Sequence, residues 1–194
     1  MNHYYLLNSI IPENLGFDKL ENFLTEKLQS SLVTLEGEFE PSTIVTAEMI
    51  AESSAASAIS DLKTIDLRAN PYNRVFLSYL FKIFKNTPTI NEIRAQVNID
   101  NFHAYVKARY GDSDSRKKMN YADIRPSVDY VISVENCDID LKAIPELADE
   151  DTTVALKGME FLYNNMYRDF YDDETKAIIA SAFDKDIQTY GYTF

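Results

Sequence analysis

The chain has 194 residues, of which 19 are basic and 31 acidic, so its formal net charge at pH 7 is −12. This acidic excess argues against a protein that binds nucleic acid or an anionic membrane surface, because both modes of binding pair lysine and arginine with anions. The single cysteine, Cys137, excludes an intramolecular disulfide framework and a zinc site built from several cysteines.

The predicted fold is mainly α: one domain, residues 1–194, with about six helices, a small β element and extended termini. Glycine is scarce, with five in the chain, and no Asn-Gly or Asp-Gly pair marks a tight hairpin. We expect an arm or a strand over 1–16, a helical core over 17–187 and a docking tail over 188–194. No run of about 18 apolar residues is present, so no membrane span is expected.

Two helices are predicted in the N-terminal part of the core. The first has apolar side chains at helical spacing, namely Phe17, Leu20, Phe23, Leu24, Leu28 and Leu32. Thr46 is a suitable N-cap for the second, which is rich in alanine and serine between Ala51 and Ala58. Such short side chains allow another helix to approach closely but bury little apolar area themselves.

The next helix has a clear pattern. A wide apolar stripe runs through Val75, Phe76, Tyr79, Leu80, Ile83 and Phe84. Asn70 and Pro71 are typical of a helix start, and the stretch from Asn86 to Pro88 is typical of a helix end. Thr89 and Glu92 then have the spacing of a capping box, which predicts another helix start.

Three further helices are predicted toward the C-terminus. A short helix follows Asp100 and includes Phe102 to Arg109. A long one includes Leu156 to Phe170, and a final helix is expected from Asp173 through Ile187, with acidic residues at its positive end.

Residues 127–142 carry a different pattern. The apolar residues alternate with other residues in two short runs, at Val128, Tyr130, Ile132 and Val134 and again at Ile139 and Leu141. Alternation of this kind favours a short pair of strands, joined around Glu135 and Asn136.

The sequence carries no motif typical of an enzyme or of a cofactor site. It contains no Walker loop, no GxGxxG, no GxSxG and no HExxH. The two histidines, His3 and His103, lack a second metal ligand at a suitable spacing. Cys137 is flanked by three acidic residues that raise a thiol pKa, so we expect a buried, inert thiol. The protein is therefore predicted to be non-catalytic, with no cofactor and no metal.

Two groups of residues are candidate contacts with a partner. The last five residues include alternating aromatic side chains, Tyr190, Tyr192 and Phe194, which would be costly to leave in water. We expect this tail to dock either on its own domain or on a neighbouring chain. Positive charge is concentrated at Arg109, Arg116, Lys117 and Lys118. These cations form either a solvated loop or a patch that meets an acidic face of another subunit.

Several short segments carry a resemblance to a known family. They are the alanine-rich helix from Ala47 to Leu62, the sequence AYVKARY over 104–110, Ile144-Pro145-Glu146, and the apolar positions Ala155-Leu156 and Phe161-Leu162. Together, across 46–170, they resemble the head–tail adaptor (connector) proteins of tailed bacteriophages, although the residues before Thr46 have no counterpart. The resemblance implies a small helical protein that assembles into a ring beneath the portal, with an extended terminus docking on a neighbour.

Two functions follow as competing hypotheses. The first is a non-catalytic structural subunit of the virion, a connector component that forms a homo-oligomeric ring and contacts other structural proteins through the cations and the aromatic tail. The second is a cytoplasmic acidic inhibitor or nucleic-acid mimic, in which carboxylates over 146–151 and 169–174 bind a basic partner protein. Neither hypothesis involves a membrane or direct, sequence-specific binding of nucleic acid.

Overall fold

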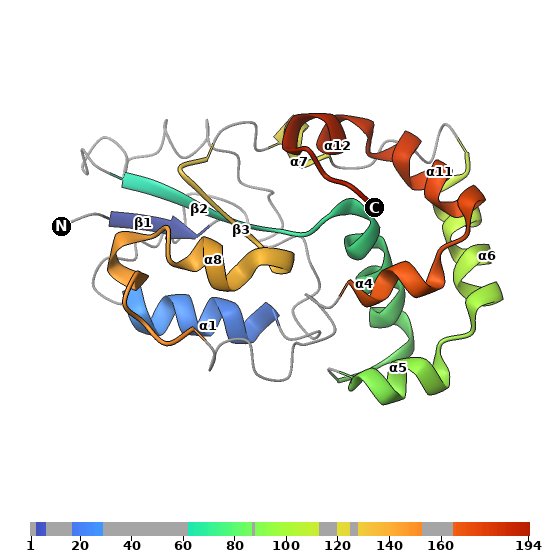
Figure 1. Cartoon of the computed structure of the whole chain (residues 1–194), viewed down its shortest axis with the longest axis horizontal. Helices are drawn as coiled ribbons and strands as arrows, with labels where there is room; N and C mark the ends of the chain where they lie inside the picture. The colour runs from blue at the N-terminus through green and yellow to red at the C-terminus, as the bar shows by residue number, and fades with distance from the viewer. Residues whose placement is uncertain are drawn as a thin grey trace, which may run out of the picture.

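The computed structural model of the protein describes residues 3–6, 17–28, 62–86, 88–112, 120–124, 128–152 and 165–194. These residues are mostly helical and include a small parallel β-sheet, which confirms the predicted mainly α fold (Figure 1). Among them, no helix combines the length and the apolar composition needed to cross a bilayer.

The elements have the following bounds. The strands are β1 (His3–Leu6), β2 (Leu62–Arg68) and β3 (Tyr130–Ser133). The α-helices within the described ranges are α1 (Phe17–Leu28), α4 (Pro71–Ile83), α5 (Ile90–Gln96), α6 (Ile99–Tyr110), α7 (Tyr121–Ile124), α8 (Cys137–Leu141), α11 (Asp173–Ala182) and α12 (Asp184–Tyr190). Short 3-10 helices are η4 (Val134–Asn136), η5 (Pro145–Leu147) and η6 (Met166–Phe170).

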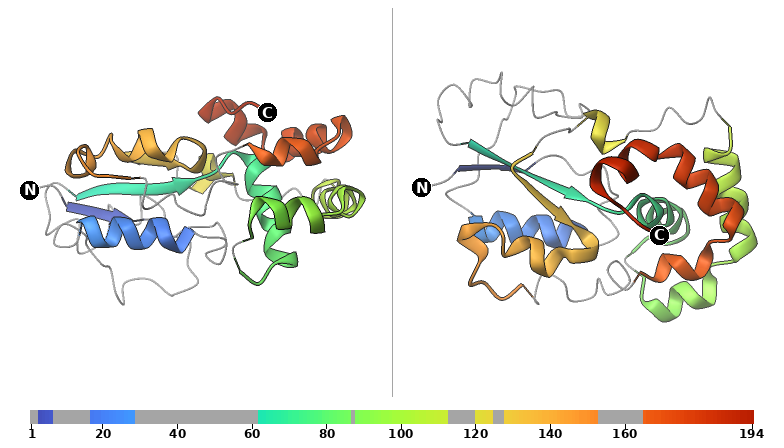
Figure 2. Two further views of the ribbon diagram at one scale, coloured as in Figure 1. Left: turned by 60° about the horizontal axis from the view of Figure 1, so that its bottom comes forward. Right: turned by 45° about the horizontal axis from the view of Figure 1, so that its top comes forward.

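The three strands form one parallel sheet in the order β1-β2-β3. Tyr4 lies opposite Lys63, and Ile65 lies opposite Tyr130, so each neighbouring strand comes from a distant part of the sequence. All three strands point toward the helical part of the molecule (Figure 2). Helix α1 covers one face of the sheet and α8 covers the other, so the sheet is a thin layer between helices.

The predicted pair of strands over 127–142 is wrong in its second half. Tyr130–Ser133 is a strand, but its partner is β2, and the chain then turns through η4 into the short helix α8. In α8, Cys137 and Leu141 are buried four positions apart, while Ile139 is 68% exposed. In so short a segment, the apolar residues fit the period of a strand as well as that of a helix. The burial of one helix face decides in favour of the helix.

Strand β2 differs from the sequence prediction, which places Leu62 at the end of an alanine-rich helix and gives no element over 63–68. The rest of that predicted helix lies outside the described residues. From Thr64 to Arg68 the strand is fully buried, and it includes the charged residues Asp66 and Arg68. These two residues can be buried because they form an ion pair with each other. They also interrupt the continuous apolar sequence that is typical of a central strand, so the strand is hard to predict.

Helix α4 lies at the centre of the helical part and begins where the sequence predicts, but it ends at Ile83, with Phe84 already extended, before the predicted end at 86–88. Asn70 caps its start by accepting a hydrogen bond from the Tyr72 N–H, and Pro71 is its first residue. Phe76 projects from it to stack on Phe170 at 4.8 Å, and it meets Phe102 edge to face at 5.5 Å. These rings join α4 to α6 and η6 in one core.

Other local predictions are confirmed. The capping box of α5 is present, with the Thr89 hydroxyl accepting from the Glu92 N–H and the Glu92 carboxylate accepting from the Thr89 N–H. Helix α6 spans the predicted segment 102–109, and α1 covers the predicted first helix as far as Leu28.

Two C-terminal predictions need correction. The final helix is two helices, because the backbone departs from helical geometry at Phe183, whose buried ring contacts Tyr110 and the Arg74 guanidinium. The long helix predicted to reach Phe170 does not continue through Asn165, which is left-handed with φ 51° and is followed by η6. The earlier part of that helix lies outside the described residues.

Candidate functional site

A polar cleft of about 520 Å³ opens at the carboxyl ends of β2 and β3, beside the C-terminal segment of the chain. It is lined by Asn70, Val131, Ser133, Glu135, Asn136, Asn165, Tyr167, Arg168, Tyr190, Gly191, Tyr192 and Thr193. Its lining combines side chains from β3, from the residue before α4 and from the C-terminal segment, which are far apart in the sequence. We therefore take this cleft as the candidate functional site.

Glu135 joins the end of β3 to the start of α4 across the cleft. Its Oε1 accepts from the Asn70 N–H at 3.0 Å and from the Asn73 side-chain amide at 2.8 Å. Its Oε2 accepts from the Ser133 hydroxyl at 2.6 Å. Three donors therefore surround this carboxylate and stabilise its negative charge.

Asn70 joins the start of α4 to the C-terminal segment. Its Nδ2 donates to the Thr193 carbonyl oxygen at 2.8 Å and more weakly to the Tyr167 hydroxyl at 3.4 Å. Its Oδ1 accepts from the Tyr72 N–H at 3.2 Å, which is the N-cap bond of α4. One buried side chain thus organises a helix start and one wall of the cleft.

The C-terminal segment forms that wall. Gly191 ends α12 with φ 66°, a left-handed conformation that glycine adopts without strain. The turn brings Phe194 edge to face against Tyr72 at 5.0 Å, Tyr171 at 5.7 Å and Tyr167 at 5.8 Å. The aromatic tail therefore docks on its own chain, which is one of the two alternatives that the sequence left open.

Tyrosine hydroxyls supply much of the polar lining. Burial raises the pKa of Tyr167, and the neighbouring Arg168 opposes part of that rise. Burial also raises the pKa of Tyr190 and of Tyr192. All three hydroxyls are therefore protonated at neutral pH and can donate hydrogen bonds.

Arg168 is the exposed cation of the cleft. Its guanidinium lies 5.8 Å from the centre of the Tyr167 ring and 5.9 Å from that of Phe194. No carboxylate in the part of the chain that the structure describes forms an ion pair with it. Its exposed charge thus lies beside two aromatic rings.

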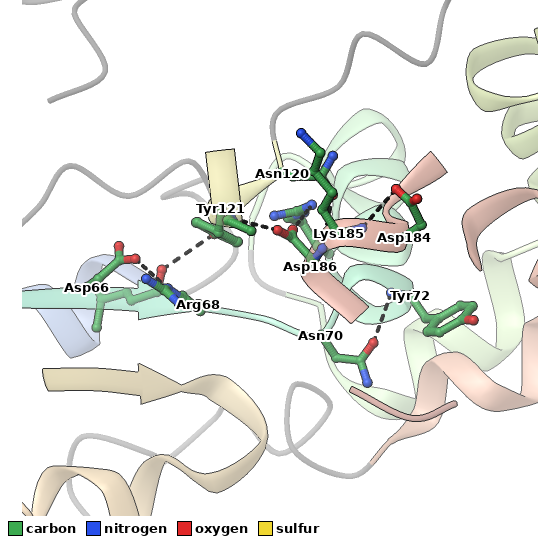
Figure 3. A network of polar contacts seen from close by, with 12 residues as sticks. Asp66, Arg68, Asn70, Tyr72, Asn120, Tyr121, Asp184, Lys185 and Asp186 are labelled. Carbon is green, nitrogen blue, oxygen red and sulfur yellow. Dashed lines mark hydrogen bonds and ion pairs between the residues drawn. The ribbon is translucent and has the colours of Figure 1, made fainter. Parts of the chain in front are cut away.

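A buried polar network joins β2, α7 and α12 (Figure 3). Asp66 and Arg68 are two positions apart on β2, so their side chains lie on the same face of the strand. The Arg68 Nε donates to the Asp66 Oδ2 at 2.6 Å, and both side chains are almost completely buried. The Arg68 guanidinium lies 4.3 Å from the Tyr190 ring and 5.5 Å from the Tyr121 ring. Arg68 thereby holds the end of α12, and so the cleft wall, against the central strand.

A second buried ion pair joins α12 to α4. Arg74 on α4 donates to Asp186 on α12 at 3.1 Å, and Asp186 also accepts from the Ala122 N–H at 2.9 Å. The Asn120 side-chain oxygen accepts from the Asp186 N–H at 3.3 Å. In Figure 3, Asp186 lies between Asn120 and Tyr121, so α7 and α12 are joined at this point.

The structure separates the residues that the sequence singled out as partner contacts. Tyr190 and Tyr192 line the cleft, and Phe194 packs beside it. Arg109 is exposed on α6 and does not line the cleft. The remaining predicted cations, Arg116, Lys117 and Lys118, lie outside the described residues.

The two acidic segments proposed to bind a basic partner also lie apart. Residues 146–151 are beside α1, where Lys27 pairs with Glu150 at 2.6 Å. Residues 169–174 are in the helical part, where Lys107 pairs with Glu174 at 2.7 Å (Figure 1). The structure therefore does not combine them into one carboxylate array.

Cys137 is buried, and burial together with the acidic residues around it raises its pKa to about 12. This agrees with the inert thiol expected from the sequence. Within the ranges that the structure describes, no three histidine, cysteine or acidic side chains are grouped as a metal site.

The sequence does not mark Glu135, Asn70 or Arg168 as site residues. It predicts a helix start at Asn70 and a connection between strands at Glu135. Polar residues directly after two strands of a parallel sheet are the signal that could have found the first two. That signal becomes readable only when β2 and β3 are known to be adjacent and parallel.

Comparisons of the chain with family models, curated proteins and solved structures give no match.

Proposed function

We propose that this protein is a non-catalytic structural subunit that associates with copies of itself through the polar cleft. The observation that carries the proposal is the anchored wall of the cleft. Thr193 is bonded to Asn70 and Tyr190 packs on Arg68, so the donors of this wall are held in place before any partner arrives. Preorganised donors favour association because little ordering entropy remains to be lost.

A connector component of a phage virion is the more specific form of this proposal. It rests on the resemblance, of which the segment 104–110 lies in α6. A ring of acidic subunits would suit a conduit for DNA, since like charge keeps the duplex from adhering to the wall.

The test is the native mass of the full chain, measured by light scattering at low and at high salt. We expect a defined oligomer at low salt and a smaller mass at high salt, because exposed charge pairs are screened. The mass of a single chain under both conditions would contradict the proposal.

Two matched variants locate the interface. Val131→Lys adds a charge in the cleft, at a side chain that is 38% exposed, and should reduce the mass. Ile139→Lys adds the same charge at an exposed position of α8 outside the cleft, and should leave the mass unchanged. Equal behaviour of the two variants would place the interface elsewhere.

A further inference from the structure

Two charged side chains line the cleft, and their surroundings differ. Glu135 accepts hydrogen bonds from a backbone N–H, an amide and a hydroxyl, so its charge is largely satisfied by the chain itself. Arg168 is exposed, and no described carboxylate forms an ion pair with it. Arg168 is therefore the charged side chain of the cleft lining that has neither an ion-pair partner among the described carboxylates nor a set of hydrogen bonds like that of Glu135.

The polar groups of the cleft suit one kind of ligand. A guanidinium presents its donors in a planar fork that matches the two oxygens of a carboxylate. The amide side chains of Asn136 and Asn165 and the side chain of Tyr192 also line the cleft. Amide and hydroxyl groups are donors that a carboxylate can accept from.

We propose that the cleft is a carboxylate-binding site, in which Arg168 is the charge partner and the carboxylate comes from a second copy of this chain. The source of the carboxylate rests on the proposed function. It is argued from charge complementarity: the chain has 31 acidic and 19 basic residues, so a neighbouring copy brings an excess of carboxylates to a cation that lacks one.

The first experiment tests the site without requiring an oligomer. The full chain is titrated with the blocked tripeptide Gly-Asp-Gly, acetylated and amidated, and with Gly-Asn-Gly as the uncharged control, while amide shifts are followed by NMR. We expect only the aspartate peptide to shift the signals of Asn136, Asn165 and Gly191. In Arg168→Gln, its binding should weaken about tenfold or more, the usual effect of losing a hydrogen bond to a charged group.

Arg94→Gln is the matched control, since it removes the same charge from an exposed position on α5, outside the cleft. It should bind the aspartate peptide as the unaltered chain does. Circular dichroism of both variants checks that the helical fold is retained. Equal binding of the two peptides, no binding of either, or equal affinity in Arg168→Gln and Arg94→Gln would each overturn the carboxylate site.

The second experiment tests the source of the carboxylate by light scattering. If the unaltered chain is an oligomer, Arg168→Gln should lower the mass and Arg94→Gln should not. An unchanged mass in Arg168→Gln overturns the contribution from a second copy while the proposed self-association stands. A single-chain mass of the unaltered protein, together with selective binding of the aspartate peptide, overturns self-association and supports the carboxylate site.

Discussion

The side-chain amide of Asn70 donates a hydrogen bond to the carbonyl oxygen of Thr193, 123 positions later in the chain, at a distance of 2.8 Å. The same side chain accepts the N-cap bond of α4 through its oxygen. The start of the central helix and the C-terminal segment therefore depend on one residue, and substitutions can separate its two roles.

Asn70→Ala removes both roles. We expect it to lower the free energy of unfolding by about 1–2 kcal/mol, since the cap is lost together with the tail anchor. Asn70→Ser retains a cap acceptor but lacks the amide donor, so most of the stability should return. Hydrogen exchange near Thr193 should be faster in both variants. Slow exchange there in Asn70→Ser would show that the amide does not anchor the tail.

Phe194→Ala removes the ring that packs against Tyr72, Tyr167 and Tyr171. The side chain is partly buried, so we expect a loss of about 1–3 kcal/mol from burial and edge-to-face contacts. Urea denaturation measures the change. Thr193→Ala is the control, because it leaves the backbone carbonyl that Asn70 binds. Equal midpoints for Phe194→Ala and the unaltered chain would contradict docking of the tail on its own domain.

Asp186→Ala leaves Arg74 without its charge partner in a buried site. Breaking a buried pair on one side costs about 3–5 kcal/mol, so we expect severe destabilisation in urea. The double variant Arg74→Met with Asp186→Leu removes both charges and should be less destabilised than Asp186→Ala. Asp184→Ala, on the exposed start of the same helix, should change stability little. A double variant less stable than Asp186→Ala would argue against an uncompensated charge as the cause.

Asp172 caps α11 through hydrogen bonds from the Thr175 hydroxyl and N–H, and these bonds hold the Asp172 pKa below its usual value of 3.8. A lowered pKa means that the folded state favours the carboxylate. Its contribution to stability is therefore full above the usual pKa and is lost as the pH falls through the lowered pKa.

Asp172→Asn retains a cap acceptor without charge. We expect the stability difference between it and the unaltered chain to shrink as the pH falls below about pH 4, where the carboxylate becomes protonated. Urea denaturation at several pH values measures this difference. A difference that grows as the pH falls below about pH 4 would mean that the carboxylate is disfavoured in the folded state.

Cys137 should react slowly with iodoacetamide in the native protein at pH 8, because burial and nearby carboxylates raise its pKa to about 12. After unfolding in guanidinium chloride, the thiol should return to a pKa of about 8.5 and become accessible, so it should react much faster. Mass spectrometry of quenched samples follows the reaction. Comparable rates in the two states would show that the thiol is accessible in the native fold.

The helices predicted correctly are those specified by residues close together in the sequence. The α4 stripe, its start at Asn70 and the capping box of Thr89 and Glu92 all depend on positions three or four apart. The helix break at Phe183 was missed because its ring is fixed by Tyr110 and Arg74, which are distant in the sequence. Contacts between residues that are distant in the sequence cannot be predicted from local periodicity.

The sheet depends even more on contacts between residues that are distant in the sequence. Alternation of apolar residues predicts a pair of strands joined around Glu135, whereas β3 pairs with a strand 65 residues earlier. The charged residues Asp66 and Arg68 interrupt the apolar run of β2, and no element is predicted over 63–68. Pairing between distant strands is decided by the burial of both faces, which a single segment does not reveal.

The sequence by itself determined the helical class, the main helix start, the capping box and the need of the aromatic tail for a docking place, because these follow from composition and short-range spacing. Only the tertiary structure decided that the tail docks on its own chain and that Asn70, Glu135 and Arg168 share one cleft. The physical reason is that a cleft is formed by long-range packing, which brings together side chains whose positions in the sequence have no fixed spacing.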